Sequence, residues 1–247
     1  MDAALAALLF APGLALGSFL NVAAARIPLK RSLVRPGSAC LACGEPVAWY
    51  DNIPLVSYAV LRGRCRRCGA QIGLVYPAVE LVTALLLVGC VLRFGLSARA
   101  AVEAFFCAAL VVVSATDLSH RIVPNRVVLP AAAVVLAGQT AIDASPEWAI
   151  GALGASGFLF LAVLAYPKGM GMGDVKLALL MGAALGRTVT VALMLGMIFA
   201  LMPSIVLLAR HGAAARKMAI PFAPFLALGS VVALFWGPQL LHLWLHR

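Results

Sequence analysis

Charged residues are scarce in this chain, and acidic residues are the scarcest of them. Only 11% of its 247 residues are charged, 64% are hydrophobic, and nine Asp and Glu stand against nineteen Lys and Arg. Soluble globular domains carry about 25% charged residues, so the composition excludes that class. We predict an all-α polytopic membrane protein. We expect no nucleic-acid partner for the net charge of +10, because basic residues that flank membrane helices act first as topology signals.

The chain also lacks two common sequence features. Its N-terminus shows no secretory signal, because Met1-Asp2 is not basic and no small-residue cleavage site follows a short apolar core. The apolar run from Ala3 to Ala25 is long enough to cross a bilayer, so we expect it to remain as a membrane helix. No Gly-rich nucleotide loop of the Rossmann type is present either.

Long apolar runs are abundant and predict about eight transmembrane helices, of which the sixth is short. Their ranges are 3–25, 76–92, 101–116, 127–142, 148–166, 175–185, 188–209 and 221–245. Fifteen of the nineteen Lys and Arg fall on one side of the alternating loops. The positive-inside rule places that side in the cytosol, and therefore predicts that the N-terminus lies outside.

Four of the six cysteines form two CxxCG motifs in the long polar segment 26–76. A CxxC spacing lets both sulfurs reach one ion, and four thiolates form a closed structural zinc site. Cytosolic conditions disfavour disulfides, so we predict zinc ligation by Cys40, Cys43, Cys65 and Cys68. The remaining Cys90 and Cys107 lie in apolar runs, where we expect them to pack as small hydrophobic side chains.

Two aspartates lie at the ends of apolar runs. Asp117 follows the run 101–116, and Asp174 begins the next short run within Gly171-Met172-Gly173-Asp174. Ionisable groups at the edge of a membrane helix are costly and usually functional, and the charge pattern places both on the cytosolic side. We therefore predict a functional pair. Gly171 and Gly173 would let an extended substrate approach the backbone.

Other polar residues near the helices allow more than one interpretation. Glu80 and Lys176 lie at the interface, where a structural ion pair or snorkelling is as reasonable as chemistry. We expect Glu103 to be solvated near the outer face.

Six motifs in the same order resemble those of the type IV prepilin peptidases. The first of them, Gly17-Ser18-Phe19-Leu20-Asn21-Val22, resembles the end of the family's first helix, and Asp117 stands at the position of its first catalytic aspartate. The other four are Trp49–Tyr58, Tyr76–Leu81, Gly171–Lys176 (the GxGD signature) and Pro221–Gly229. The chain departs from the usual pattern at Leu41, at Asn125, where the family often has Asp, and at Ala223, where Gly is frequent.

The resemblance implies an intramembrane aspartic endopeptidase of the bacterial inner membrane, with Asp117 and Asp174 as its catalytic residues. Such an enzyme removes the leader of prepilins or pseudopilins, for type IV pili or type II secretion. It then methylates the new N-terminal residue with S-adenosylmethionine, for which the sequence indicates no ligand. The expected division is a first transmembrane helix (1–25), a cytosolic four-cysteine zinc domain (26–76) and a transmembrane catalytic core (77–247).

Helix ends favour Asp174 as the anion and Asp117 as the acid, although a coupled pair titrates as a unit. Three alternatives stay open. One is an ion-coupled transporter that uses the two aspartates. Another is a non-enzymatic membrane anchor whose zinc domain binds a partner. The third is a peptidase without methyltransferase activity.

Overall fold

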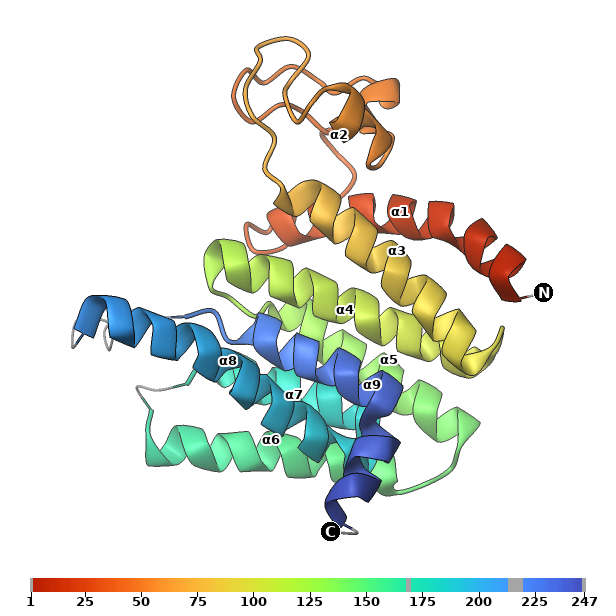
Figure 1. Ribbon diagram of the computed structural model, residues 1–247, viewed down its shortest axis with the longest axis vertical. Coiled ribbons are helices and arrows are strands. Elements are labelled where there is room, and N and C mark those ends of the chain that lie inside the picture. Colours follow the sequence, from red (N-terminus) through yellow and green to blue (C-terminus); the bar gives the residue numbers. More distant parts are fainter. Residues whose placement is uncertain (1, 168–169, 213–219, 246–247) are drawn as a thin grey trace. The chain divides into compact units, whose positions relative to one another are not determined.

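The computed structural model describes residues 2–167, 170–212 and 220–245, and their regular structure is helical apart from two isolated bridge pairs (Figure 1). The long helices are α1 (Asp2–Arg26), α3 (Val75–Phe94), α4 (Ala98–His120), α5 (Asn125–Ile142), α6 (Glu147–Ala165), α7 (Met172–Leu185), α8 (Val189–His211) and α9 (Ala223–Leu245). Three short elements are η1 (Trp49–Asn52), α2 (Val56–Val60) and η2 (Gly186–Thr188). The predicted all-α class is confirmed.

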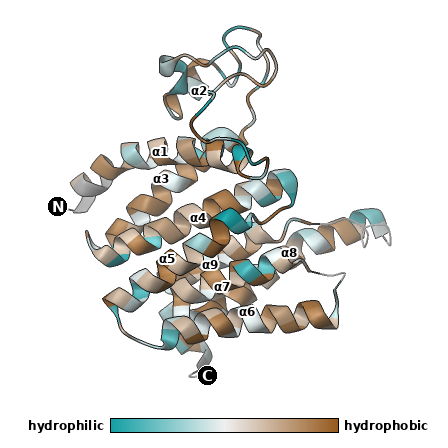
Figure 2. Cartoon of the chain, turned by 180° about the vertical axis from the view of Figure 1, so that it is seen from behind, coloured by the Kyte–Doolittle hydropathy of each residue, from teal (hydrophilic) through white to brown (hydrophobic). Residues whose placement is uncertain are grey.

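Seven segments of the described chain are long and apolar enough to cross a membrane. The predicted eight runs match the eight long helices. The difference arises because α7, η2 and α8 follow one another without a break and count as one segment, Met172–His211. Figure 2 shows hydrophobic residues along the long helices and hydrophilic residues gathered in the loops and between α1 and α3.

The chain divides into two compact units, Met1–Ala115 and Thr116–Arg247, and the boundary falls inside α4. The CxxCG motifs therefore belong to the first unit and both aspartates to the second. The predicted division at residues 26 and 77 separates polar from apolar sequence, whereas these two units are separated by their packing. The predicted division stays a prediction.

In the first unit, α1 and α3 pack at very short range through two glycines one turn apart. A Cβ on Gly17 would lie 2.5 Å from the Cα of Glu80, and one on Gly13 would lie 2.7 Å from the Cα of Ala84. Small residues spaced by four let membrane helices approach closely. Asn21 adds a hydrogen bond from its Nδ2 to the carbonyl of Tyr76, at 3.0 Å.

Burial inside the first unit contradicts the prediction for Glu103 and agrees with the one for Cys90 and Cys107. Glu103 is not solvated: its side chain is 1% exposed, and Arg99, one turn earlier on α4, lies 4.0 Å from its Oε1. The prediction was wrong because helix packing, not sequence position, decides which face of α4 is covered. Cys90 and Cys107 are buried as expected, with their sulfurs 4.0 Å apart.

In the second unit, α7 is the central helix. Nine of its fourteen residues are buried, and it packs against α5, α6 and α9. A Cβ on Gly182 of α7 would overlap the carbonyl of Gly151 on α6, so both positions require glycine for this close approach. The tight packing fixes α7, and with it the position of Asp174 in its first turn.

Candidate active site and metal centre

The four cysteines of the CxxCG motifs converge on one point in the first unit. Their sulfurs all lie within 4.8 Å of one another, and the Sγ atoms of Cys40 and Cys68 are 3.8 Å apart. Four thiolates around Zn²⁺ at about 2.3 Å would place the sulfurs about 3.8 Å from each other. The described residues therefore fit a single tetrahedral zinc ion.

Each motif forms its half of the cluster by the same local turn. In the first, Cys40 donates its N–H to Glu45 O (2.9 Å) and accepts the N–H of Gly44 (2.9 Å). In the second, Cys65 pairs in the same way with Ala70 O (2.8 Å) and the N–H of Gly69 (3.0 Å). Both glycines have a φ near +70°, which explains the glycine after each CxxC.

The same turn prepares a ligand for metal. Backbone N–H groups of Cys43 and Ala42 lower the pKa of the Cys40 thiol to about 6. Zinc binds the thiolate, so the local backbone favours at Cys40 the form that the ion needs. At Cys68 the N–H of Ala70 has the same effect, but hydrogen bonds with the neighbouring thiols and burial outweigh it and raise the pKa to about 11. Ion pairs join the two motifs and their surroundings, with Arg67 2.9 Å from Glu45 and Arg66 2.6 Å from Asp51.

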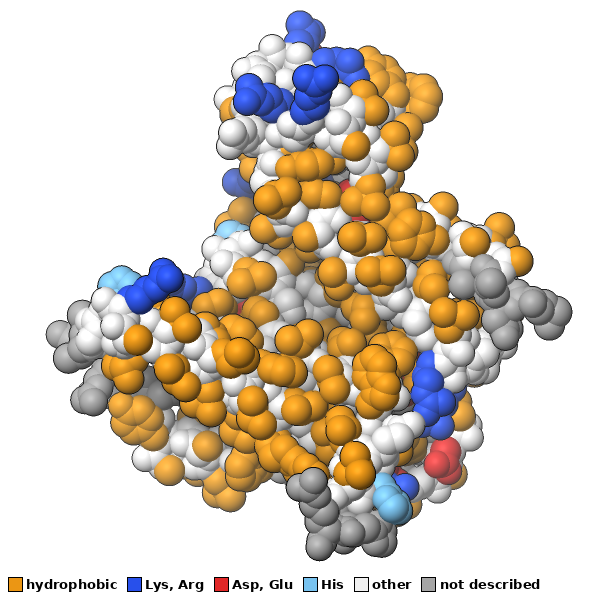
Figure 3. Space-filling view, viewed as in Figure 1, with side chains coloured by type: hydrophobic (Ala, Val, Ile, Leu, Met, Phe, Trp, Pro, Cys, Tyr) orange, Lys and Arg blue, Asp and Glu red, His pale blue; other side chains and the backbone are white. Residues whose placement is uncertain are grey.

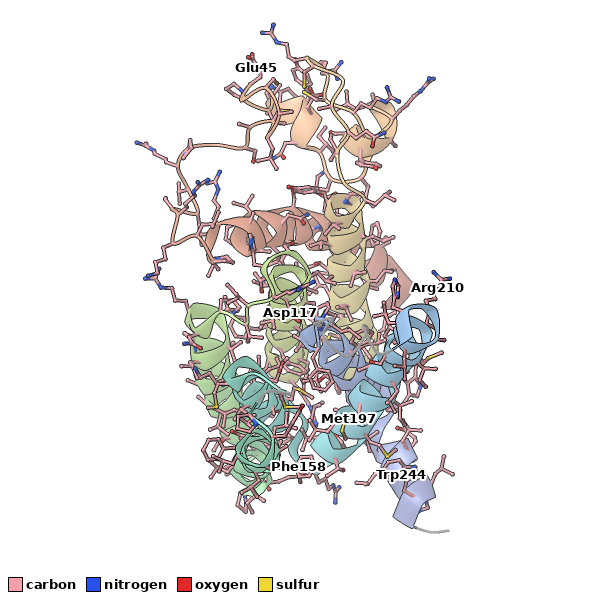
Figure 4. The ribbon with its side chains drawn as sticks, turned by 90° about the vertical axis from the view of Figure 1, so that its left-hand side faces the viewer. Glu45, Asp117, Phe158, Met197, Arg210 and Trp244 are labelled. Carbon is pink, nitrogen blue, oxygen red and sulfur yellow. The ribbon has the colours of Figure 1, made fainter. Side chains whose placement is uncertain are left out.

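Asp117 lies in the last turn of α4 and is 7% exposed (Figure 4). Its Oδ2 accepts the backbone N–H of Ala223, at 3.1 Å, from the first residue of α9. The N–H groups at the start of a helix have no partner within that helix and form a ready site for a carboxylate. The Pro221–Gly229 motif therefore supplies a donor to Asp117 across more than one hundred residues of sequence.

Asp174 lies in the first turn of α7 and is half-buried. Its carboxylate is close enough to Asp117 for their charges to interact. The second unit thus brings together the two aspartates that the sequence singled out. A pair of this kind can share one proton, and it then offers an acid and a base at the same place.

The two glycines before Asp174 have different surroundings. A Cβ on Gly173 would lie 2.8 Å from the Cβ of Val123, so the α7 N-terminus packs directly against the loop that follows α4. A Cβ on Gly171 would meet nothing nearer than 3.8 Å. Gly171 is exposed and would accept a Cβ at ordinary contact distance from the Asp174 carboxylate, whereas Gly173 is accounted for by packing.

Two interactions that involve the interfacial polar residues were not predicted. Lys176 donates from its Nζ to Oδ1 of Asn125, at 2.9 Å, and so joins α7 to the first residue of α5. Glu80 accepts the N–H of Leu55 at its Oε2, at 2.9 Å. The sequence signal was present in both cases, since these residues lie within or beside the recognised motifs, but their partners are distant in sequence.

Comparison with known proteins identifies the family of the chain. Residues 12–94 match the bacterial peptidase A24 N-terminal domain, and residues 104–237 match the type IV leader peptidase family. The fold and site define a polytopic membrane protein with two aspartates at helix ends. The chain belongs to the type IV leader peptidase family.

Several curated relatives share the name prepilin leader peptidase/N-methyltransferase. The Bacillus subtilis protein is 37% identical over 95% of this chain and 95% of its own length. The Pseudomonas aeruginosa protein is 34% identical over 92% and 89%, and the Myxococcus xanthus protein is 41% identical over 73% and 56%. No solved structure matches the chain.

Proposed function

We propose that this chain is a membrane-embedded aspartic endopeptidase that removes the leader of prepilins or pseudopilins and then N-methylates the new N-terminal residue. The observation that carries the proposal is the interacting pair of Asp117 and Asp174 at the ends of two membrane helices. Family membership and the names of its relatives support the same reaction.

The aspartate pair provides the chemistry of peptide hydrolysis. With one proton shared, the ionised carboxylate removes a proton from water, and the resulting hydroxide attacks the scissile carbonyl carbon. The protonated carboxyl donates its proton toward the carbonyl oxygen, and the amine leaves with a proton returned by the pair. The N–H of Ala223 holds one oxygen of Asp117 in place during these transfers. The N-terminus of α9 therefore acts on Asp117 in addition to the end of α4, on which Asp117 lies.

The substrate side follows from the surroundings of Asp174. The exposed backbone at Gly171 lets an extended peptide approach beside the carboxylate. A prepilin joins a polar leader to an apolar helix, so its helix can remain in lipid while the cleavage site reaches the pair. Zinc at Cys40, Cys43, Cys65 and Cys68 holds the polar segment in shape and, with four ligands, leaves no position for catalysis.

The proposal of methyl transfer from S-adenosylmethionine is supported by the name of the relatives, and we assign no residue to the methyl donor. The chain is placed in the bacterial inner membrane as a multi-pass protein. Its Lys and Arg pattern supports a cytosolic position for residues 26–76 and for both aspartates. Cysteines introduced at Arg35 and Arg216, the latter outside the described residues, should resist impermeant reagents added to intact cells. Labelling at both positions from outside would reverse the orientation.

The deciding experiment is co-expression with a prepilin and mass spectrometry of the product. Loss of the leader together with one added methyl group is the expected result. Loss of the leader alone would indicate a peptidase without methyltransferase activity, and an unchanged prepilin would overturn the proposal.

A further inference from the structure

Residues 49–60, here termed the η1–α2 segment, expose a large amount of hydrophobic surface. Their exposed fractions are 81% for Trp49, 69% for Val60, 56% for Val56, 50% for Tyr50 and 43% for Ile53. Figure 3 shows hydrophobic side chains gathered on one side of the polar segment between α1 and α3, with Lys and Arg on the other. A contiguous exposed apolar patch of this kind marks an interaction surface.

The patch is held together as one surface. Val56 and Val60 are four residues apart on α2 and so lie on the same face. Ser57 of the same helix is buried; its Oγ accepts the N–H of Ile53 at 3.0 Å and donates to the carbonyl of Tyr50 at 2.9 Å. These bonds fix η1 against α2, so the exposed side chains cannot turn inward independently.

The η1–α2 segment is also attached to a membrane helix. Glu80, 9% exposed, accepts the N–H of Leu55, the residue immediately before α2. Glu80 lies five residues beyond Val75, where a candidate membrane span begins, which is about 8 Å along α3. The bond therefore holds the start of α2 at the end of a membrane span, where the headgroup region of the bilayer lies.

The chemistry of the patch suits lipid. Trp and Tyr are enriched at the membrane–water interface, where the ring contacts acyl chains and the polar end contacts headgroups. Lipid is always present beside the end of a membrane span such as α3, whether or not a partner protein is bound.

We propose that the η1–α2 segment lies in the interfacial layer of the bilayer, with Trp49, Val56 and Val60 against lipid. The segment acts as a peripheral anchor that fixes the zinc-bearing polar segment on the membrane surface. This inference does not depend on the proposed peptidase activity.

The test uses the full chain with zinc bound, in nanodiscs that contain anionic lipid. Fluorescence quenching is measured for the wild type and for Trp49→Phe, so that the difference reports on Trp49 alone. Lipids brominated near the headgroup end of the acyl chain should quench this difference signal more than lipids brominated near the chain end. Aqueous acrylamide should quench it weakly.

A matched control uses the first CxxCG motif. Leu41 is 93% exposed and belongs to the motif that immediately precedes Glu45, which Figure 4 shows at the end of the polar segment far from α1 and α3. A tryptophan introduced by Leu41→Trp in the Trp49→Phe chain should be quenched by acrylamide and not by brominated lipid. Val56→Glu together with Val60→Glu should make Trp49 accessible to acrylamide while the zinc content stays unchanged.

Two results would overturn the inference. One is a Trp49 signal that acrylamide quenches as readily as the Leu41→Trp control and that brominated lipid leaves unchanged. The other is a Trp49 signal that becomes protected only when prepilin is added, which would identify the surface as a site for protein.

Discussion

The zinc cluster and the aspartate pair are built in opposite ways. Each half of the zinc cluster is a turn of a few residues, and its hydrogen bonds join Cys40 to Glu45 or Cys65 to Ala70. Asp117 instead takes its donor from Ala223, 106 residues away. One site can form wherever its short motifs meet a metal ion, whereas the other exists only when a whole helical unit has folded. Removal of a residue should therefore disturb the two sites in different ways.

The largest effect is expected at the aspartate pair. Asp117→Asn and Asp174→Asn preserve size and polarity but remove the shared proton, so each should lower leader cleavage by about 10²–10⁴-fold or more. The double variant should be little worse than either single one, because residues that act as a unit are not additive. Cleavage of a purified prepilin in detergent measures this. Near-normal rates in either single variant would remove the aspartic mechanism.

The zinc cluster should respond locally. Purified protein should carry about one zinc per chain, and Cys40→Ser with Cys43→Ser should lower the metal content sharply. Acid should release the metal, because protons compete with zinc for the thiolates. The low pKa of Cys40, about 6, delays its protonation. Metal analysis across a pH series gives the result, with Cys90→Ser as the control that should retain zinc. Unchanged zinc in the double variant would refute the site.

An intermediate effect is expected for the hydrogen bond between Lys176 and Asn125, because it joins α7, near Asp174, to α5. A hydrogen bond to a charged group contributes about 1.5–3 kcal/mol, and partial exposure reduces this. Lys176→Met should therefore slow cleavage about tenfold, mainly in kcat. Asn125→Asp should retain activity, since the carboxylate can accept the same bond. Arg187→Met serves as the control cation in the same unit, and equal rates for Lys176→Met and wild type would exclude a positioning role.

The smallest effect is expected for the ion pair of Asp51 and Arg66, because the Arg66 side chain is 53% exposed. Arg66 donates to both oxygens of Asp51, at 2.6 and 2.8 Å, and this hydrogen bonding lowers the pKa of Asp51. A lowered pKa adds stability above the ordinary Asp pKa, and that stability is lost as the pH falls through the lowered value. Asp51→Asn should lower the thermal midpoint slightly at neutral pH and not in strong acid. A difference that persists in acid would show that charge is not its origin.

The contrast between the sites also explains what the sequence could predict. The CxxCG spacing identified the four cysteines because the turn that joins each pair is local. The aspartates were identified by their motifs and because an ionisable group at the end of an apolar run is costly to place in a membrane. The Ala223 donor, the Lys176–Asn125 bond and the burial of Glu103 could not be predicted, because they depend on which helices pack together. Apolar runs separated by charged loops predict each helix by itself. Which face of a helix is buried depends on neighbouring helices that are distant in the sequence.

The length of α7 has a consequence for the solvation of its two polar ends. Its fourteen residues rise about 21 Å, whereas the hydrocarbon layer is about 30 Å thick. Because α7 packs against α5, α6 and α9, protein rather than lipid borders this short helix, and the bilayer does not have to thin around it. Asp174 begins α7, and Arg187 follows it in η2, so these two polar ends are closer together than the two faces of the hydrocarbon layer. At least one end therefore lies below the headgroup level, where protein groups or water that enters between the helices must solvate it.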